Sequence, residues 1–266
     1  MWRAILATTG SPGLVHELGG VAVVDVTRPA QLTGYLADSD APAVVVAHPV
    51  HAHAARVACT VVSGDRPDLL VARRTATQAP LAALLALVTA RRSARDAGHG
   101  GTMWADLSDA TWSAAVVSRA SRLPYPNPSL LQHARSLLPG SRYLARLHPD
   151  PEVLGSGQLA AALAPLAGVG VRLTTTGTDP DEPVLRTIVE QLRPHSLERL
   201  DLPGDWAAVF GGPVEQQLAA VPQHALELTR PAGPPCRSCG LSLAEAVCGF
   251  CQARTGAVLT SAGGHA

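Results

Sequence analysis

The sequence predicts an α/β fold, in which a Rossmann-like or flavodoxin-like parallel sheet carries helices on both faces. A mixed helical second half and a small C-terminal zinc ribbon follow it. Two observations predict this architecture. Short Val/Ile/Leu/Ala segments alternate with helix-forming segments through the first hundred residues, and four cysteines stand in two C-x-x-C pairs near the end. The short segments are apolar on both faces, as buried parallel strands are.

The first part of the chain, residues 1–97, contains the repeated strand–helix units. Four strands are expected, at Arg3–Thr8, Val21–Val26, Ala43–Ala47 and Asp68–Arg73. Four helices are expected between and after them, at Gly13–Leu18, Pro29–Ala37, His51–Val62 and Gln78–Asp96. Right-handed crossovers between parallel strands place such helices on both faces of the sheet, so a layered α/β domain is predicted.

The second part, residues 98–229, has a different pattern and is predicted to be mixed α/β, either packed on the first part or forming a domain of its own. Gly98 to Gly101 are expected to form a flexible joint. Helices are predicted at Ser108–Arg122, Ser129–Leu138, Gly157–Leu166, Pro183–Leu192 and Val214–Ala220, one strand at Gly170–Thr175, and an extended segment at Ala225–Thr229. A proline-rich linker at 230–235, a ribbon at 236–254 and a disordered tail at 255–266 complete the predicted organisation.

Composition excludes several function classes. The chain has 266 residues, and its 21 basic residues, all arginine, balance 21 acidic ones. Without lysine the chain lacks the phosphate-binding lysine of a P-loop, the Schiff-base lysine of a pyridoxal-phosphate enzyme and the strand lysine of a protein kinase. No apolar run reaches the roughly 20 residues that span a bilayer, and the N-terminus lacks a charged signal-peptide region. We therefore expect a cytoplasmic protein with no membrane association.

The four cysteines at the C-terminus are the strongest signal in the sequence. Cys236 and Cys239 form one C-x-x-C pair, and after eight residues Cys248 and Cys251 form another. Two such knuckles fit tetrahedral Zn²⁺, and a closed shell of four thiolates leaves no position for a reactive water. The predicted zinc is therefore structural. A redox dithiol pair and an iron–sulfur site are the alternatives.

This cysteine pattern, with Gly240 directly after the first pair, resembles the C-terminal zinc finger of PP-loop tRNA 2-thiolation enzymes. The resemblance covers some 20 residues. Those enzymes open with an S-G-G-x-D-S loop after their first strand, whereas residues 8–13 here read T-T-G-S-P-G and lack the aspartate and one glycine. The resemblance therefore implies at most a degenerate, non-catalytic relative.

Two further segments contain candidate site residues. The loop after the first strand offers hydroxyl and backbone N–H donors for an anion, from Thr8, Thr9, Gly10, Ser11 and Gly13. Short turns of this kind also join strands to helices in proteins that bind nothing.

Histidines gather at the end of the third expected strand, at His48, His51 and His53. They are candidates for metal binding or acid–base chemistry, although capping or solvated side chains would explain them equally. Arg73, at the end of the fourth strand, is a candidate for binding a phosphate or carboxylate through two hydrogen bonds.

Two functions are compatible with these patterns. The first is a non-catalytic cytoplasmic adaptor or assembly component, whose zinc ribbon docks a protein partner or RNA or DNA. The second is an enzyme that acts on a nucleotide or phosphorylated ligand at the C-terminal ends of the strands in the N-terminal sheet, with a degenerate relative of PP-loop tRNA-modifying enzymes as one form of it. The adaptor is favoured because the metal site is closed and no complete catalytic motif is present. The sequence gives no indication of the oligomeric state.

Overall fold

The computed structural model describes residues 1–8, 15–37, 39–138, 141–177, 182–204, 206–243 and 247–254. Its first half contains a five-stranded sheet with the strand order β2-β3-β1-β4-β5. All neighbouring strands in it are parallel except β2 and β3. The strands are β1 (Arg3–Thr8), β2 (His16–Leu18), β3 (Val21–Asp25), β4 (Ala43–Ala47) and β5 (Val71–Thr75).

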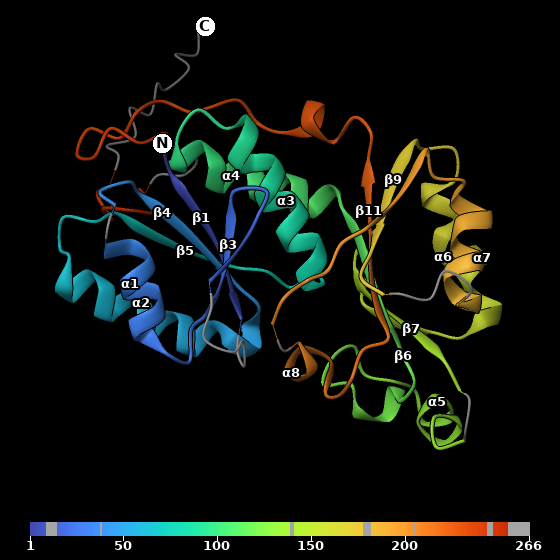
Figure 1. Cartoon of the computed structure of the whole chain (residues 1–266). Helices are drawn as coiled ribbons and strands as arrows, with labels where there is room; N and C mark the ends of the chain where they lie inside the picture. The colour runs from blue at the N-terminus through green and yellow to red at the C-terminus, as the bar shows by residue number, and fades with distance from the viewer. Residues whose placement is uncertain are drawn as a thin grey trace, which may run out of the picture.

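Helices cover both faces of this sheet (Figure 1). Successive side chains of a strand point to opposite faces. Accordingly Ile5 and Ala7 pack against α1 (Pro29–Ala37) and α2 (Ala52–Asp65), which follows the short η1 (Pro49–His51). Ala4 and Leu6 face the other way, toward α3 (Pro80–Ser93) and α4 (Ala97–Ala110). The predicted layered α/β arrangement is thus present in this half.

The second half contains a six-stranded sheet with the order β10-β9-β11-β6-β7-β8. Its strands are β6 (Trp112–Val117), β7 (Tyr143–His148), β8 (Glu152–Leu154), β9 (Val171–Thr175), β10 (Ser196–Arg199) and β11 (Gln216–Pro222). Only β9 and β10 pair in parallel. Its outer face packs on α6 (Leu159–Leu163) and α7 (Pro183–Leu192). The short elements between strands are η2 (Ala120–Arg122), α5 (Leu130–Arg135), η3 (Ser156–Gln158), η4 (Ala164–Leu166), α8 (Ala207–Phe210) and η5 (Ala225–Leu228).

Helix α3 lies between the two sheets and joins them (Figure 1). The first N–H groups of a helix have no partner within the helix. Here the second sheet provides two side-chain acceptors for these N–H groups. The hydroxyl of Ser113 accepts from Ala79 N at 3.2 Å, and the amide oxygen of Gln217 accepts from Leu81 N at 3.0 Å. The start of α3 is therefore capped by side chains from β6 and β11, across a single continuous core.

The second half is mixed α/β, but it is built on a second sheet of six strands where mainly helices were expected, so the fold is not a single flavodoxin-like sheet. The segment 108–122 was predicted as one helix, but α4 ends at Ala110 and β6 begins at Trp112. The segment 214–220 is likewise not a helix but the start of β11. All six side chains of β6 are buried, because helices cover one face of this sheet and the core between the sheets covers the other. A continuous apolar run of this kind has no period that separates strand from helix.

Three smaller predictions also differ from the structure. Residues 16–18 form the edge strand β2 in place of a helix. The four residues expected as a flexible joint, 98–101, lie inside the first half of α4. Residues 225–228 form the short helix η5 where an extended segment was expected. The strands predicted at Arg3–Thr8 and Ala43–Ala47, and the helices at Pro29–Ala37 and Pro183–Leu192, are confirmed with the same bounds.

Candidate functional site

The four predicted metal ligands come together. The sulfur atoms of Cys236, Cys239, Cys248 and Cys251 all lie within 4.8 Å of one another. The Sγ atoms of Cys236 and Cys251 are 3.6 Å apart, as are those of Cys239 and Cys248. A tetrahedral ion with Zn–S bonds of about 2.3 Å needs sulfurs about 3.8 Å apart. The cluster therefore has the size of a four-thiolate metal site.

Local backbone geometry explains why the sulfurs converge. In each knuckle the chain turns back, so that Gly240 N donates to Cys236 O at 2.8 Å and Gln252 N donates to Cys248 O at 3.0 Å. Backbone N–H groups of Cys239 and Ser238 lower the pKa of the Cys236 thiol to about 7. Burial raises the pKa of Cys239 to about 12. A metal ion binds the deprotonated form of both, so its affinity depends on pH.

The three candidate histidines do not form a metal site among the described residues, where the cysteines are the one group of suitable ligands. His48 caps η1 by accepting from Val50 N at 3.4 Å, and burial lowers its pKa to about 4, with a further contribution from His51. His51 is buried with its ring edge-on to Trp206, at 6.1 Å between centroids. His53 is exposed on α2.

The predicted anion loop can be placed only at its first residue, because Thr9, Gly10, Ser11 and Gly13 lie outside the described residues. Thr8 is buried at the end of β1. The loop after β10 covers it: a side-chain carbon added at Gly204 would lie 2.6 Å from the Thr8 hydroxyl. Arg73 is exposed on β5. Thr8 and His48 directly follow paired residues of the neighbouring strands β1 and β4, and the anion site predicted at this edge of the sheet stays a prediction.

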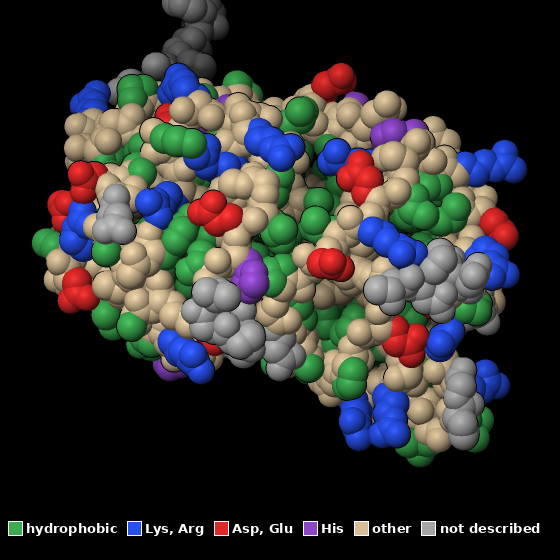
Figure 2. Space-filling view, in the orientation of Figure 1, with side chains coloured by type: hydrophobic (Ala, Val, Ile, Leu, Met, Phe, Trp, Pro, Cys, Tyr) green, Lys and Arg blue, Asp and Glu red, His purple; other side chains and the backbone are tan. Residues whose placement is uncertain are grey.

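A cavity of about 550 Å³ lies between the two halves of the molecule, at residues that no sequence pattern marks as a site. Helix α3, the β2–β3 turn, β9, β10, the end of β11 and η5 surround it. Its apolar lining includes Leu18, Leu84, Leu107, Val221, Ala225 and Leu226. Figure 2 shows apolar side chains exposed between the two halves of this face, with charged side chains beside them. The volume lies within the roughly 300–1,000 Å³ of small-molecule sites.

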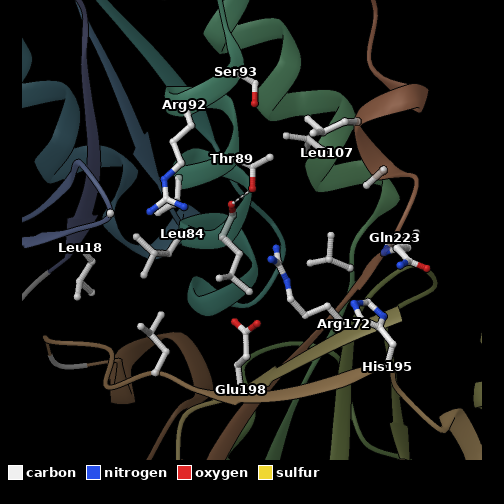
Figure 3. A pocket seen from close by; sticks show the side chains of 18 residues that line it. Leu18, Leu84, Thr89, Arg92, Ser93, Leu107, Arg172, His195, Glu198 and Gln223 are labelled. Atoms are coloured by element: carbon white, nitrogen blue, oxygen red, sulfur yellow. Dashed lines mark hydrogen bonds between the residues drawn. The ribbon is translucent and has the colours of Figure 1, made fainter. Parts of the chain in front are cut away.

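Charged side chains surround the mouth of the cavity. Arg92 reaches in from α3 and Glu198 from β10, while Arg172 and His195 extend beside Glu198 (Figure 3). Among the described residues, neither arginine nor Glu198 is in an ion pair, and the Nε of Arg172 is buried with no hydrogen-bond partner. Two arginines against one glutamate make the mouth net positive. The cavity thus combines an apolar interior with an entrance that attracts an anion.

Sequence reasoning missed this cavity because its residues come from separate elements. Leu18 precedes a turn, Leu84 belongs to an apolar helix, and Arg172 stands second in a buried strand. One local signal was available: an arginine within the otherwise apolar and hydroxyl-bearing segment 171–175 requires a polar partner or an opening to solvent.

Comparison with known proteins gives matches in structure alone, since no protein-family model and no curated protein matches the sequence. A DegV family protein from Eubacterium eligens, loaded with heptadecanoic acid, has a TM-score of 0.57 and 10% identity over 84% of this chain and 99% of its own. The fatty acid kinase (Fak) B3 protein of Streptococcus pneumoniae, loaded with linoleic acid, has a TM-score of 0.55 and 12% sequence identity, and the match covers 84% of this chain and 99% of that protein. A fatty-acid-binding DegV family protein from Thermus thermophilus has a TM-score of 0.56 and 12% sequence identity, and the match covers 84% of this chain and 100% of that protein. The chain has the DegV fold.

These matches correct the function expected from the sequence. Proteins of this fold bind fatty acids in three of the matched structures. The comparisons contradict both the adaptor that docks a protein or nucleic acid and the enzyme acting on a nucleotide or phosphorylated ligand. They also give no support to the resemblance to PP-loop enzymes. Among the described residues, no helix is long and apolar enough to cross a membrane.

Proposed function

We propose that the protein binds a long-chain fatty acid in the cavity between its two sheets. The observation that carries this proposal is the combination of an apolar interior with two arginines outside ion pairs at its mouth. Three of the matched structures are of fatty-acid-loaded or fatty-acid-binding proteins, which supports this proposal. The acyl chain would lie against Leu84, Leu107 and Val221. The carboxylate would accept hydrogen bonds from Arg172, whose Nε is buried without a partner.

The test is a titration of the delipidated protein with an 18-carbon fluorescent polyene fatty acid. A charge-assisted hydrogen bond contributes about 1.5–3 kcal/mol, so Arg172→Gln is expected to weaken binding about 10- to 100-fold. Arg56→Gln removes an exposed arginine from α2, outside the cavity, and serves as the matched control. Val88→Trp, which adds bulk to the lining, is expected to abolish binding.

Chain length provides a second readout. Each buried methylene contributes about 0.8 kcal/mol, so binding should weaken by up to about fourfold for each methylene removed from the ligand. A probe that binds with the same affinity to wild type, Arg172→Gln and Val88→Trp occupies another site. An absence of binding at micromolar probe would contradict the proposed function itself.

We propose in addition that the metal of the four-cysteine cluster is a structural Zn²⁺. The support is chemical: four thiolates in two knuckles form a tetrahedral donor set that zinc prefers, with every position taken by the protein. Elemental analysis of protein purified without chelator or affinity metal should give one zinc per chain. Iron with inorganic sulfide would point to a cluster of the ferredoxin type.

A further inference from the structure

The segment between the cavity and the cysteines connects the two sites. From η5 the chain runs across the molecule past α4 to the cysteine module (Figure 1). We call residues 223–243 the strap. We infer that metal binding at the four cysteines holds the strap in place and thereby maintains one wall of the cavity, so that metal occupancy regulates ligand binding. The ligand part of this inference rests on the proposed function.

The cysteine end of the strap is fixed to α4. Ser242, between the two knuckles, donates its hydroxyl to Asp96 Oδ2 at 2.7 Å and its N–H to Asp96 Oδ1 at 3.3 Å. Asp96 is also the N-cap of α4 and accepts from His99 N at 3.0 Å. Arg95 donates to the Ser242 hydroxyl at 2.7 Å. One carboxylate therefore binds both the first turn of α4 and the metal-binding module.

The fit between module and helix is close. A side-chain carbon at Gly98, in the first turn of α4, would lie 2.1 Å from the backbone oxygen of Ser242. The second knuckle approaches β5, where the guanidinium of Arg74 would lie 3.3 Å from a side-chain carbon at Gly249. Leu241 and Phe250 pack on the main core. The module is thus seated against α4 and β5.

The other end of the strap forms part of the cavity. Ala225 and Leu226 of η5 line it together with Leu107 of α4. Just after η5, Arg230 makes a bidentate contact with Asp106 of α4, with Nη2–Oδ1 at 2.7 Å and Nε–Oδ2 at 3.1 Å, and Arg230 N donates to the same carboxylate at 2.8 Å. The strap is therefore attached to α4 near both of its ends, by Asp106 and by Asp96.

Metal binding supplies the free energy that holds this arrangement. Among the described residues, the module has two isolated β-bridges and no longer strand pairing, so its fold depends on its ligands. When the knuckles lose their metal, we expect Ser242 to lose its contact with Asp96. The strap then depends on its remaining attachments, which are Arg230 on Asp106, Gln223 N on Gly170 O at 2.7 Å, and Ala225 in the main core. Coupling between two sites is reciprocal, so a ligand in the cavity must in turn raise the affinity for metal.

Hydrogen–deuterium exchange and probe affinity, measured on the full chain, test the inference. The protein is compared zinc-loaded, after treatment with a chelator, and after zinc is added back. Ser242→Ala keeps all four cysteines and removes the hydroxyl contact with Asp96. Cys239→Ser removes a ligand, and Cys59→Ser, which changes a buried cysteine of α2 outside the cluster, is its matched control.

Chelation is expected to speed exchange in residues 97–102 and 225–230 and to weaken fatty-acid binding about fivefold or more, as is typical of coupled sites. Zinc should reverse both effects. Ser242→Ala should retain one zinc and still show faster exchange in residues 97–102, and Cys59→Ser should match the wild type. Faster exchange confined to residues 233–254, or an unchanged probe affinity in the metal-free protein, would overturn the inference. If zinc-loaded protein binds no fatty acid, the proposed function fails, and exchange at η5 alone decides whether the metal holds the strap.

Discussion

Substitution of Gly98 by alanine is the sharpest single test of the contact between the cysteine module and α4. Alanine favours a helix over glycine by about 0.5–1 kcal/mol, so the change would stabilise α4 if nothing lay beside it. The added carbon would instead lie 2.1 Å from Ser242 O and 2.8 Å from Ser242 N, and backbone atoms at that distance must move. The displacement disrupts the hydrogen bonds between Ser242 and the charged Asp96, which contribute about 2–3 kcal/mol together.

The net expectation is a loss of about 1–2 kcal/mol, or roughly 3–6 °C in the thermal midpoint for a chain of this length. Gly34→Ala is the matched control, because Gly34 lies within α1 and has nothing within 4 Å of the added carbon. That variant should gain up to about 1 kcal/mol. Calorimetry of the zinc-loaded proteins measures both, and the rate of zinc extraction by a chromogenic chelator should rise in Gly98→Ala only. Equal stability of the two variants would refute the seating of Ser242 on α4.

Three further outcomes are expected. Cys239→Ser should bind less than one zinc per chain by elemental analysis. Cys59→Ser should retain the zinc, because Cys59 lies outside the cluster and burial raises the pKa of its thiol to about 11 in the wild type. Full zinc retention in Cys239→Ser would contradict the four-cysteine site. The pKa of His48 is lowered from 6.5 to about 4, so the unfolded chain binds more protons between these values and stability should fall as pH decreases from 6.5 to 4. His48→Gln should show a shallower fall in thermal midpoint over that range, and an identical profile would contradict the burial of a neutral imidazole. Arg172→Gln should lose affinity for a fatty acid but not for the corresponding alcohol, and equal losses would place the carboxylate elsewhere.

The local sequence pattern was sufficient to predict an element when its burial is the same along its whole length or follows a simple period. The strand at Ala43–Ala47 was predicted with correct bounds because both of its faces are buried, which makes it apolar throughout. The four cysteines were found because metal ligation imposes a spacing that is visible in the sequence. Helix Pro183–Leu192 has a clear apolar face, with Leu185, Ile188 and Leu192 buried.

Long-range packing decided the elements that were predicted wrongly. The glycines of residues 98–101 suggest a joint, yet they lie in a helix where other segments approach its backbone closely: Ser242 lies against Gly98 and the Trp2 ring against Gly100. Strand β6 has the same apolar composition as a buried helix, and only its pairing with β7 and β11 distinguishes the two. The cavity has no local signature, because residues 18 and 226 meet only after the two sheets have packed.

The capping of α3 by the second sheet limits how a ligand can reach the cavity. Hinge opening between the halves would withdraw Ser113 and Gln217 from the start of the helix and leave two buried amide hydrogens without acceptors. Rigid-body separation is therefore costly, and the low-energy route is a local displacement at the rim. We therefore expect entry and exit of the proposed ligand to depend on η5 and the β2–β3 turn, which line the cavity. Exchange rates should respond to substitutions in those short segments while the two halves keep their mutual orientation.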